Sequence, residues 1–178
     1  MIENRRGVTL PELLGAIVIL AIVTSLLGAV AFAMVRAIDR IAVNQSAEAT
    51  GLYLVDYLED AMADRAPNAY DDSCAGTGGC VVLIQEYAYA YDPVDGSIDA
   101  VVHVPPLETE FSIHDDAVWI NGASVDAGDF TIGSDASLSV NDVLGSVTVT
   151  IAFSLVAADG RTFPFFAEYR FTVSEIPA

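Results

Sequence analysis

The sequence predicts an α+β fold in which one long N-terminal helix, first transmembrane and then amphipathic, packs on a C-terminal antiparallel β-sheet head. Three observations predict this fold. After Glu12, the 23 residues from Leu13 to Val35 carry no charge. Apolar residues then recur at three- and four-residue intervals as far as Met62, which is typical of a helix with one buried face. From Cys80 onward, short runs of alternating apolar and polar residues are separated by turn residues, which is typical of strands.

The uncharged stretch is long enough to cross a membrane. A helix rises about 1.5 Å per residue, so this stretch reaches roughly 35 Å, whereas the hydrocarbon core of a bilayer is about 30 Å thick. Glu12 lies at the edge of the span, where an unpaired carboxylate costs several kcal/mol. We therefore expect Glu12 to meet a positively charged group, most simply on a second copy of the chain.

The helix is expected to continue beyond the span and to bury one face against the head. Its apolar residues there are Ile38, Ile41, Ala49, Leu52, Val55, Leu58 and Met62. The helix is predicted to end near Ala66, because Pro67 disfavours helical geometry in the residue before it. The head then comprises residues 67–178, which is enough chain for one small domain.

Strands are predicted in the head wherever the pattern alternates. They are expected at residues 81–84, 86–91, 98–104, 111–113, 117–120, 130–132, 146–156 and 162–173. Pro105 and Pro106 are expected to interrupt the third of these strands, and Asn121-Gly122 predicts a tight turn. The last two strands are expected to form a long hairpin. Pro164 indicates that the second of them is an edge strand or contains a bulge.

Charge and composition exclude several functions. The formal net charge is −18, and all seven basic residues are arginines. Nucleic-acid affinity rests largely on basic side chains that neutralise phosphates, so direct nucleic-acid binding is disfavoured. The absence of lysine excludes a P-loop lysine, a Schiff base and lysine-based isopeptide cross-links. Neither a G-x-S-x-G nucleophile elbow nor a recognisable catalytic carboxylate pair is found, so we predict no catalytic residues and no enzymatic activity.

The two cysteines, Cys74 and Cys80, enclose a small glycine-rich loop. Outside the membrane such a pair usually oxidises, and closing this loop would stabilise the fold by roughly 2 kcal/mol. We predict a disulfide, with a reduced pair as the alternative. No metal site is predicted, because zinc needs three or four convergent ligands and His103 and His114 have no paired spacing with the cysteines.

Two further features of the head have a functional and a structural interpretation. Tyr87, Tyr89 and Tyr91 share one strand face, where they could stack on sugars or aromatic ligands, although cross-strand packing more often explains such a stripe. The carboxylates around Gly96, on Asp92, Asp95 and Asp99, could bind calcium or form a solvated acidic turn. Their spacing differs from the EF-hand pattern, so no cofactor is predicted apart from this calcium alternative.

The N-terminal residues resemble the type IV prepilin family, which includes type IV pilins and the pseudopilins of type II secretion and DNA-uptake (competence) machines. The resemblance rests on a basic leader, Gly7, the run Thr9-Leu10-Pro11-Glu12-Leu13, and the unbroken apolar stretch. It covers about the first 30 residues. The chain departs from the usual family pattern at Val8, where Phe is most frequent, and at Pro11, where an aliphatic residue is usual.

The resemblance implies a pilin-like fold with four segments: a prepilin leader (1–7), a transmembrane assembly helix (8–36), its amphipathic continuation (37–66) and a β-rich head (67–178). It implies that prepilin peptidase cleaves after Gly7 and that Val8 is then N-methylated. Glu12 would neutralise the N-terminal amine of the neighbouring subunit. The implied partners are other pilin subunits, an assembly platform, a motor ATPase and, before assembly, membrane lipid.

We therefore expect a structural subunit, a minor pilin or pseudopilin, of a type IV pilus-like filament. It would cross the cytoplasmic membrane once with its head outside and then enter a periplasmic or extracellular filament. Short strands and strong acidity favour a minor subunit. The alternatives are a plain single-span anchor and a secreted protein cleaved after Ala31-Phe32-Ala33, either of which would carry a ligand-binding or adhesive β domain.

Overall fold

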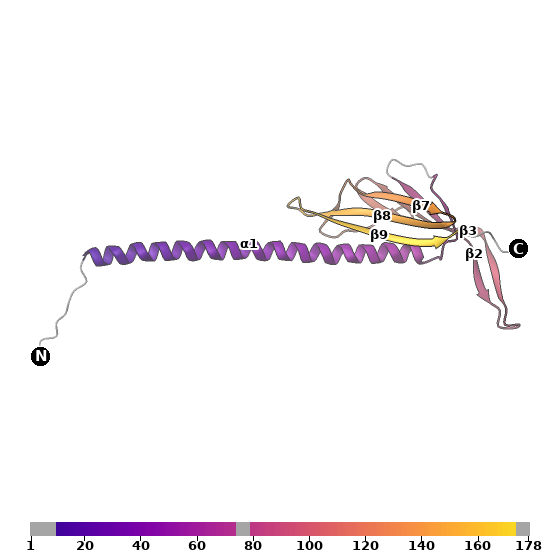
Figure 1. The fold of residues 1–178 in the computed structure, drawn as a ribbon, viewed down its shortest axis with the longest axis horizontal. Helices are drawn as coiled ribbons and strands as arrows, with labels where there is room; N and C mark the ends of the chain where they lie inside the picture. Colours follow the sequence, from indigo (N-terminus) through magenta and orange to yellow (C-terminus); the bar gives the residue numbers. More distant parts are fainter. Residues whose placement is uncertain (1–9, 74–78, 174–178) are drawn as a thin grey trace. The chain divides into compact units, whose positions relative to one another are not determined.

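A computed structural model of the chain describes residues 10–73 and 79–173. The chain divides into two compact units, Met1–Gln45 and Ser46–Ala178. One helix, α1 (Leu10–Ala63, 54 residues), supplies the described part of the first unit and then enters the second (Figure 1). The observed fold class is the predicted one, a long apolar N-terminal helix followed by an antiparallel β domain.

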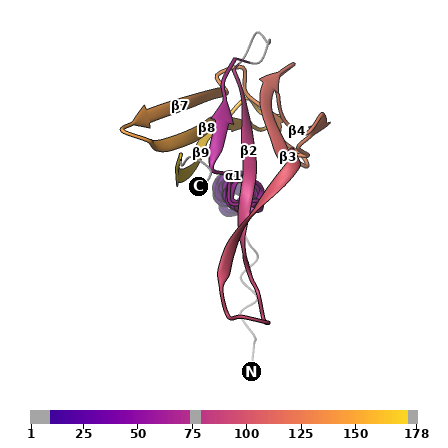
Figure 2. The ribbon, with the colours of Figure 1, turned by 90° about the vertical axis from the view of Figure 1, so that its right-hand side faces the viewer.

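The strands of the second unit form two antiparallel sheets. The strands are β1 Ala69–Asp71, β2 Cys80–Tyr91, β3 Ile98–His114, β4 Ala117–Ile120, β5 Ala123–Ser124, β6 Thr131–Ile132, β7 Ser137–Val143, β8 Ser146–Val156 and β9 Thr162–Thr172. The first sheet has the order β1-β2-β3-β4-β5. In the second sheet β8 is central. Strand β9 pairs with one edge of β8, and β6 and β7 pair with different parts of its other edge. Viewed along α1, β7 to β9 lie on one side and β3 and β4 on the other (Figure 2).

The core of the second unit lies between the last part of α1 and the two sheets. One stripe of α1 is buried, formed by Ala47, Gly51, Leu54, Leu58 and Met62. These residues recur every three or four positions, so they share one face of the helix. The alternation predicted in β8 is confirmed, because its buried apolar residues are Val147, Val149, Ile151, Phe153 and Leu155.

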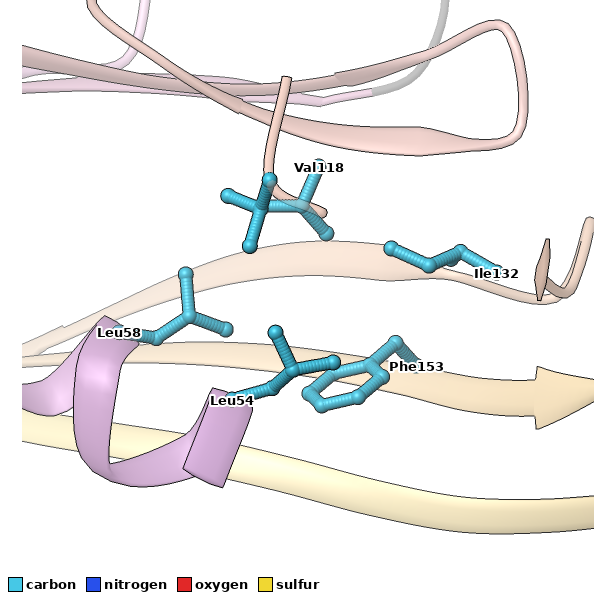
Figure 3. A pocket seen from close by; sticks show the side chains of 6 residues that line it. Leu54, Leu58, Val118, Ile132 and Phe153 are labelled. Atoms are coloured by element: carbon cyan, nitrogen blue, oxygen red, sulfur yellow. The ribbon is translucent and has the colours of Figure 1, made fainter. Parts of the chain in front are cut away.

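Side chains from four elements close the centre of this core. Leu54 and Leu58 of α1 face Val118 of β4, Ile132 of β6 and Phe153 of β8, with Val125 beside them (Figure 3). The apolar gap between them leaves no room for a water molecule. Each buried leucine contributes about 1.5–3 kcal/mol relative to an exposed one, so the helix and both sheets stabilise one another.

The helix ends three residues earlier than predicted, at Ala63 instead of Ala66. The amide of Ala66 donates to the carbonyl of Ala63, and Ala66 has a φ of 41°. A left-handed residue of this kind is a common helix terminator, whereas a following proline favours extended backbone. Ala66 leaves the right-handed helical region as predicted, but through a left-handed turn and not through the extended geometry that proline favours.

Pro105 and Pro106 do not end their strand, and this prediction was wrong. β3 runs through both prolines, but its register against β2 changes there, from Leu107 opposite Gln85 to Val102 opposite Tyr87. The register shift leaves the prolines outside the paired ladder. A bulge can accommodate proline because the ladder does not need its missing N–H.

The other strand predictions fared better, with three omissions. β4 and β8 have the predicted bounds, and Asn121-Gly122 forms the predicted turn with φ of 50° and 77°. Pro164 lies in β9, an edge strand whose one described partner is β8, and the pairing runs through it without a register shift. Strands β1, β5 and β7 were not predicted, because they are short or mainly polar.

Candidate functional site

The described part of the first unit is a helix whose residues 13–35 carry no charge on any side. Its large apolar side chains, from Leu10 to Ile41, are between 44% and 75% exposed. An ordinary surface helix would bury one such stripe. Among the described residues α1 is the one helix long and apolar enough to cross a membrane, and the window that qualifies is not buried. The helix therefore offers apolar surface on every side over this stretch, which lipid or other protein segments can cover.

The few polar groups of this stretch are satisfied within the helix itself. The hydroxyl of Thr24 donates to the carbonyls of Leu20 and Ala21 at 2.9 and 3.0 Å. The hydroxyl of Ser25 donates to the carbonyl of Ile22 at 2.9 Å. Such bonds remove the need for water, and inside a bilayer every polar group must find a protein partner. The stretch can therefore sit in lipid without an unpaired hydroxyl.

A charge of opposite sign lies at each end of the apolar stretch. Glu12 is in the first turn of α1, directly after Pro11, where a carboxylate interacts favourably with the positive end of the helix dipole. At the other end, the guanidinium of Arg36 lies 4.2 Å from the centre of the Phe32 ring. The exposed carboxylate of Glu12 can accept a proton or a hydrogen bond from a cationic group on another molecule.

The residues predicted to be processed lie outside the described part of the chain. This holds for Gly7 and Val8, the predicted cleavage and methylation sites, so both remain predictions. It also holds for Cys74. Cys80 begins β2 at the edge of the described region, and the disulfide between the two cysteines stays a prediction.

The structure separates the three tyrosines of β2. Tyr87 is 5% exposed and packs in the core, whereas Tyr89 and Tyr91 are 64% and 66% exposed. The rings of Tyr87 and Tyr89 meet edge to face at 5.7 Å. The structural interpretation thus fits Tyr87 alone, and the other two rings remain available to a partner.

Two of the acidic residues around Gly96 accept hydrogen bonds from backbone amides of their own turn. Asp92 accepts from the amide of Val94 at 2.7 Å, and Asp95 accepts from the amide of Ser97 at 2.8 Å. The bond from Ser97 lowers the pKa of Asp95 below its ordinary value. No three acidic, histidine or cysteine side chains among the described residues are arranged to hold a metal ion, so the calcium interpretation gains no support.

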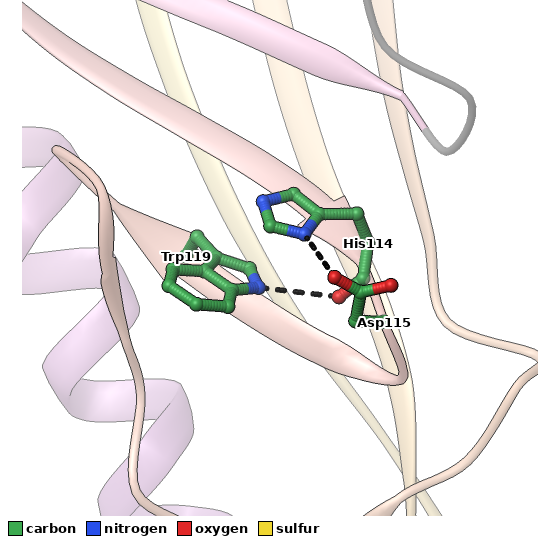
Figure 4. Close-up of polar contacts among 3 residues, drawn as sticks. All are labelled: His114, Asp115 and Trp119. Atoms are coloured by element: carbon green, nitrogen blue, oxygen red, sulfur yellow. Dashed lines mark hydrogen bonds and ion pairs between the residues drawn. The ribbon is translucent and has the colours of Figure 1, made fainter.

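The one His–Asp contact in the described head lies at an exposed turn. His114 Nδ1 is 3.2 Å from Asp115 Oδ2, and the indole of Trp119 donates to the carbonyl of His114 at 3.1 Å (Figure 4). The imidazole and indole rings stack with centres 4.5 Å apart. Because Asp115 and Asp116 both have φ of 54°, these contacts hold a tight turn. Ser134 lines the pocket beside His114 and Asp115.

Two features of the second unit were missed in the sequence. Tyr53 and Tyr57, on the solvent side of α1, stack with ring centres 6.3 Å apart and are 64% and 45% exposed. Their four-residue spacing was the available signal. The buried Asn68 binds β2 at its register shift, donating to the carbonyl of Tyr87 and accepting from the amide of Glu86, both at 2.9 Å. No local pattern marks that role.

The comparison with known families agrees with the helix geometry. Residues 3–28 match a family described as the prokaryotic N-terminal methylation motif. No curated protein and no solved structure matches the chain. The matched segment contains Gly7, Val8, Glu12 and the first half of the apolar stretch. The matched motif overlaps the start of a helix that is long and apolar enough to span a membrane, so the N-terminal region of the chain is similar to that of the type IV prepilin family.

Proposed function

We propose that the protein is a structural subunit, a minor pilin or pseudopilin, of a type IV pilus-like filament. The observation that carries the proposal is the exposed apolar surface of α1 between Leu13 and Val35, a stretch without any charge. Lipid can cover that surface before assembly, and the helices of other subunits can cover it afterwards. The prepilin family is structural, which agrees with a protein that assembles and catalyses no reaction.

Assembly follows from the charges at the ends of this helix. Prepilin peptidase would cleave after Gly7 and expose the amine of Val8, which then becomes N-methylated. That amine is a cation with which the carboxylate of Glu12 in a neighbouring subunit can form an ion pair, and such a pair is favourable in an apolar environment. The single pass would place the head outside the cytoplasmic membrane, and an assembly platform with a motor ATPase would supply energy to extract the subunit.

The N-terminus of the mature protein tests this proposal directly. Mass spectrometry of the protein from its own cells should show a chain that begins at methylated Val8 and is present in sheared filaments. A chain that begins at Met34 would identify a secreted protein, and one that begins at Met1 a plain anchor. Either result would overturn the proposal.

The role of Glu12 is tested by removing its charge. Glu12→Gln and Glu12→Ala should leave membrane insertion intact but lower incorporation into filaments about tenfold, since a hydrogen bond to a charged group contributes about 1.5–3 kcal/mol. Glu48→Gln, at an exposed position of the same helix, is the control and should assemble normally. Equal yields for the Glu12 and Glu48 variants in quantitative immunoblots of sheared filaments would exclude the pairing.

The exposed rings of Tyr89 and Tyr91 favour a second candidate function, a membrane-tethered or secreted ligand-binding or adhesive β domain. Aromatic faces of this kind can stack on sugars. This candidate predicts saturable glycan binding by the protein and an N-terminus at Met1 or Met34. A glycan array probed with the full chain would distinguish the two functions.

A further inference from the structure

A pocket of about 350 Å³ lies in the second unit, between the end of α1 and the strands β3 and β4. We call it the helix-end pocket. Binding pockets for small molecules begin at about 300 Å³, so this one has room for a single small ligand or one long side chain. Its polar lining consists of Tyr57, Asp60, Asp64, Arg65, Thr109 and Asn121.

The α1 side of the helix-end pocket is negatively charged. The amide of Asp64 donates to the carbonyl of Asp60 at 2.8 Å, so the helical spacing continues past Ala63 and places both carboxylates on one side of the chain. Both aspartates are exposed. They lie at the C-terminal end of the helix, where the helix dipole favours a cation, yet the last turn of α1 contains no basic residue. A bound cation would therefore meet a favourable potential here.

Arg65, directly after Asp64, does not neutralise the two carboxylates. Its guanidinium donates to the carbonyl of Glu108 at 3.3 Å. Within residues 10–73 and 79–173, neither Asp60 nor Asp64 belongs to an ion pair. The pocket thus has two carboxylates against one guanidinium. An anionic ligand would be repelled by them and by the formal net charge of −18.

A buried hydroxyl group faces the same pocket. Thr109 is 8% exposed and alternates with the buried Phe111 and Ile113 along β3, so its side chain lies on the inner face of that strand. Its hydroxyl has no hydrogen-bond partner in the described part of the chain. The one fully enclosed side-chain atom there without a partner is Nε2 of His103, so the Thr109 hydroxyl opens into the pocket that this residue lines. A hydroxyl in this position needs a partner from within the pocket.

These groups select the chemistry of the ligand. A calcium ion takes six to eight oxygen ligands, and no three acidic, histidine or cysteine side chains among the described residues are arranged for a metal. An ammonium or guanidinium group fits better, because its several N–H groups can donate to two carboxylates and a hydroxyl together. The ring of Tyr57, which is 45% exposed, adds an aromatic face on which such a cation can rest.

We propose that the helix-end pocket binds one organic cation, an alkylammonium or alkylguanidinium group. The carboxylates of Asp60 and Asp64 pair with its charge, and the hydroxyl of Thr109 accepts one of its hydrogen bonds. The ring of Tyr57 covers its alkyl stem. A free small amine carries such a group, and so does a basic side chain of another protein. All of these residues lie in the second unit, so the inference does not rest on the proposed filament function.

Ligand-observed NMR titrations of the full-length protein in a nonionic detergent test the proposal. The probes are butylammonium, butylguanidinium and butylurea, the last being the uncharged counterpart of butylguanidinium. The two cations should bind with dissociation constants of about 1 mM, which is usual for ligands of this size. Butylurea should bind about tenfold more weakly. Equal binding of butylurea, or displacement of butylguanidinium by an equal concentration of Ca²⁺ at constant ionic strength, would overturn the inference.

Substitutions locate the bound cation. Asp60→Asn with Asp64→Asn should weaken butylguanidinium binding about tenfold. Glu48→Gln with Asp129→Asn removes the same charge at exposed positions outside the pocket and should leave binding unchanged. Thr109→Val should weaken binding about threefold without lowering the melting temperature, because the hydroxyl has no partner in the fold. Equal losses in the two double variants, or unchanged binding in Thr109→Val, would contradict the assignment.

A peptide distinguishes the two sources of the cation. Acetyl-Gly-Arg-Gly-amide presents the guanidinium group on a backbone, as a partner protein would. Affinity equal to or higher than that of butylguanidinium supports the site and identifies a basic side chain as its guest. Lower affinity supports the site and identifies a free small cation. If neither the peptide nor the free cations bind, the helix-end pocket is not a cation site.

Discussion

The two parts of α1 have the same backbone geometry but opposite relations to the rest of the chain. In the first unit the large apolar side chains are exposed on all sides of the helix, and in the second unit one stripe is buried against two sheets. The buried part is held by contacts that the chain makes with itself. The exposed part offers apolar surface that lipid or other molecules can cover, which makes it the candidate assembly site.

The comparison predicts that the same leucine substitution has opposite consequences in the two parts. Leu58→Ala removes a side chain that is 1% exposed and should destabilise the head by about 2–5 kcal/mol, because it leaves a cavity in a closed core. Leu20→Ala, at a position 64% exposed, should change head stability by less than about 0.5 kcal/mol. Denaturant unfolding of the full chain in detergent, followed by the fluorescence of Trp119, measures both. Similar shifts would show that the first unit is coupled to the core.

Glycine substitutions sharpen the comparison. A side chain at Gly51 would collide with the ring of Phe165, whereas nothing lies within 4 Å of a Cβ built at Gly28. Gly51→Val should therefore destabilise the head by about 1–3 kcal/mol through overpacking, and Gly28→Val should not. Combining Gly51→Ala with Phe165→Leu should recover stability relative to Gly51→Ala alone. No recovery in the same unfolding assay would mean that the ring is not the cause.

The smallest expected effect is on the melting temperature of the head at acidic pH. Hydrogen bonds from the amide and side chain of Arg161 lower the pKa of Asp159, and bonds from Ser73 lower that of Asp71. A lowered folded-state pKa stabilises the fold above the unfolded value of about 3.9, and this contribution is lost as pH falls through the folded-state pKa. The melting temperature of the head should thus fall slightly below about pH 4.

Asp159→Asn removes one of these titrating groups, so it should reduce the acid sensitivity of the melting temperature while changing it little at pH 7. Asp116→Asn, at an exposed position of another turn, serves as the control. Melting curves between pH 2.5 and 7 that are identical for the wild type and Asp159→Asn would contradict the assignment.

Local sequence patterns were sufficient to predict a structure wherever that structure follows from the polarity of neighbouring residues. The charge-free run after Glu12 predicted a membrane-spanning helix, because its composition alone determines which solvent it prefers. The alternation in residues 146–156 predicted a strand with one buried face, which is β8. The matched motif, which includes Gly7, Val8 and Glu12, was likewise visible without any tertiary information.

Other features depend on contacts between distant segments. The prolines of β3 are tolerated because the register shift against β2 removes them from the ladder. Asn68 supports that shift from 18 residues away in sequence. The short strands β1 and β5 exist only because a longer neighbour offers them a pairing edge, which no pattern within two or three residues can encode.

By itself, the sequence determined that this chain has a helix long and apolar enough to span a membrane, with an acid in its first turn, since hydropathy and charge act locally. Only the tertiary structure decided which tyrosines of β2 are buried and which are exposed. Burial depends on where β2 leaves the core, and that point is set by the long-range pairing of β2 with β3 and by the side chain of Asn68.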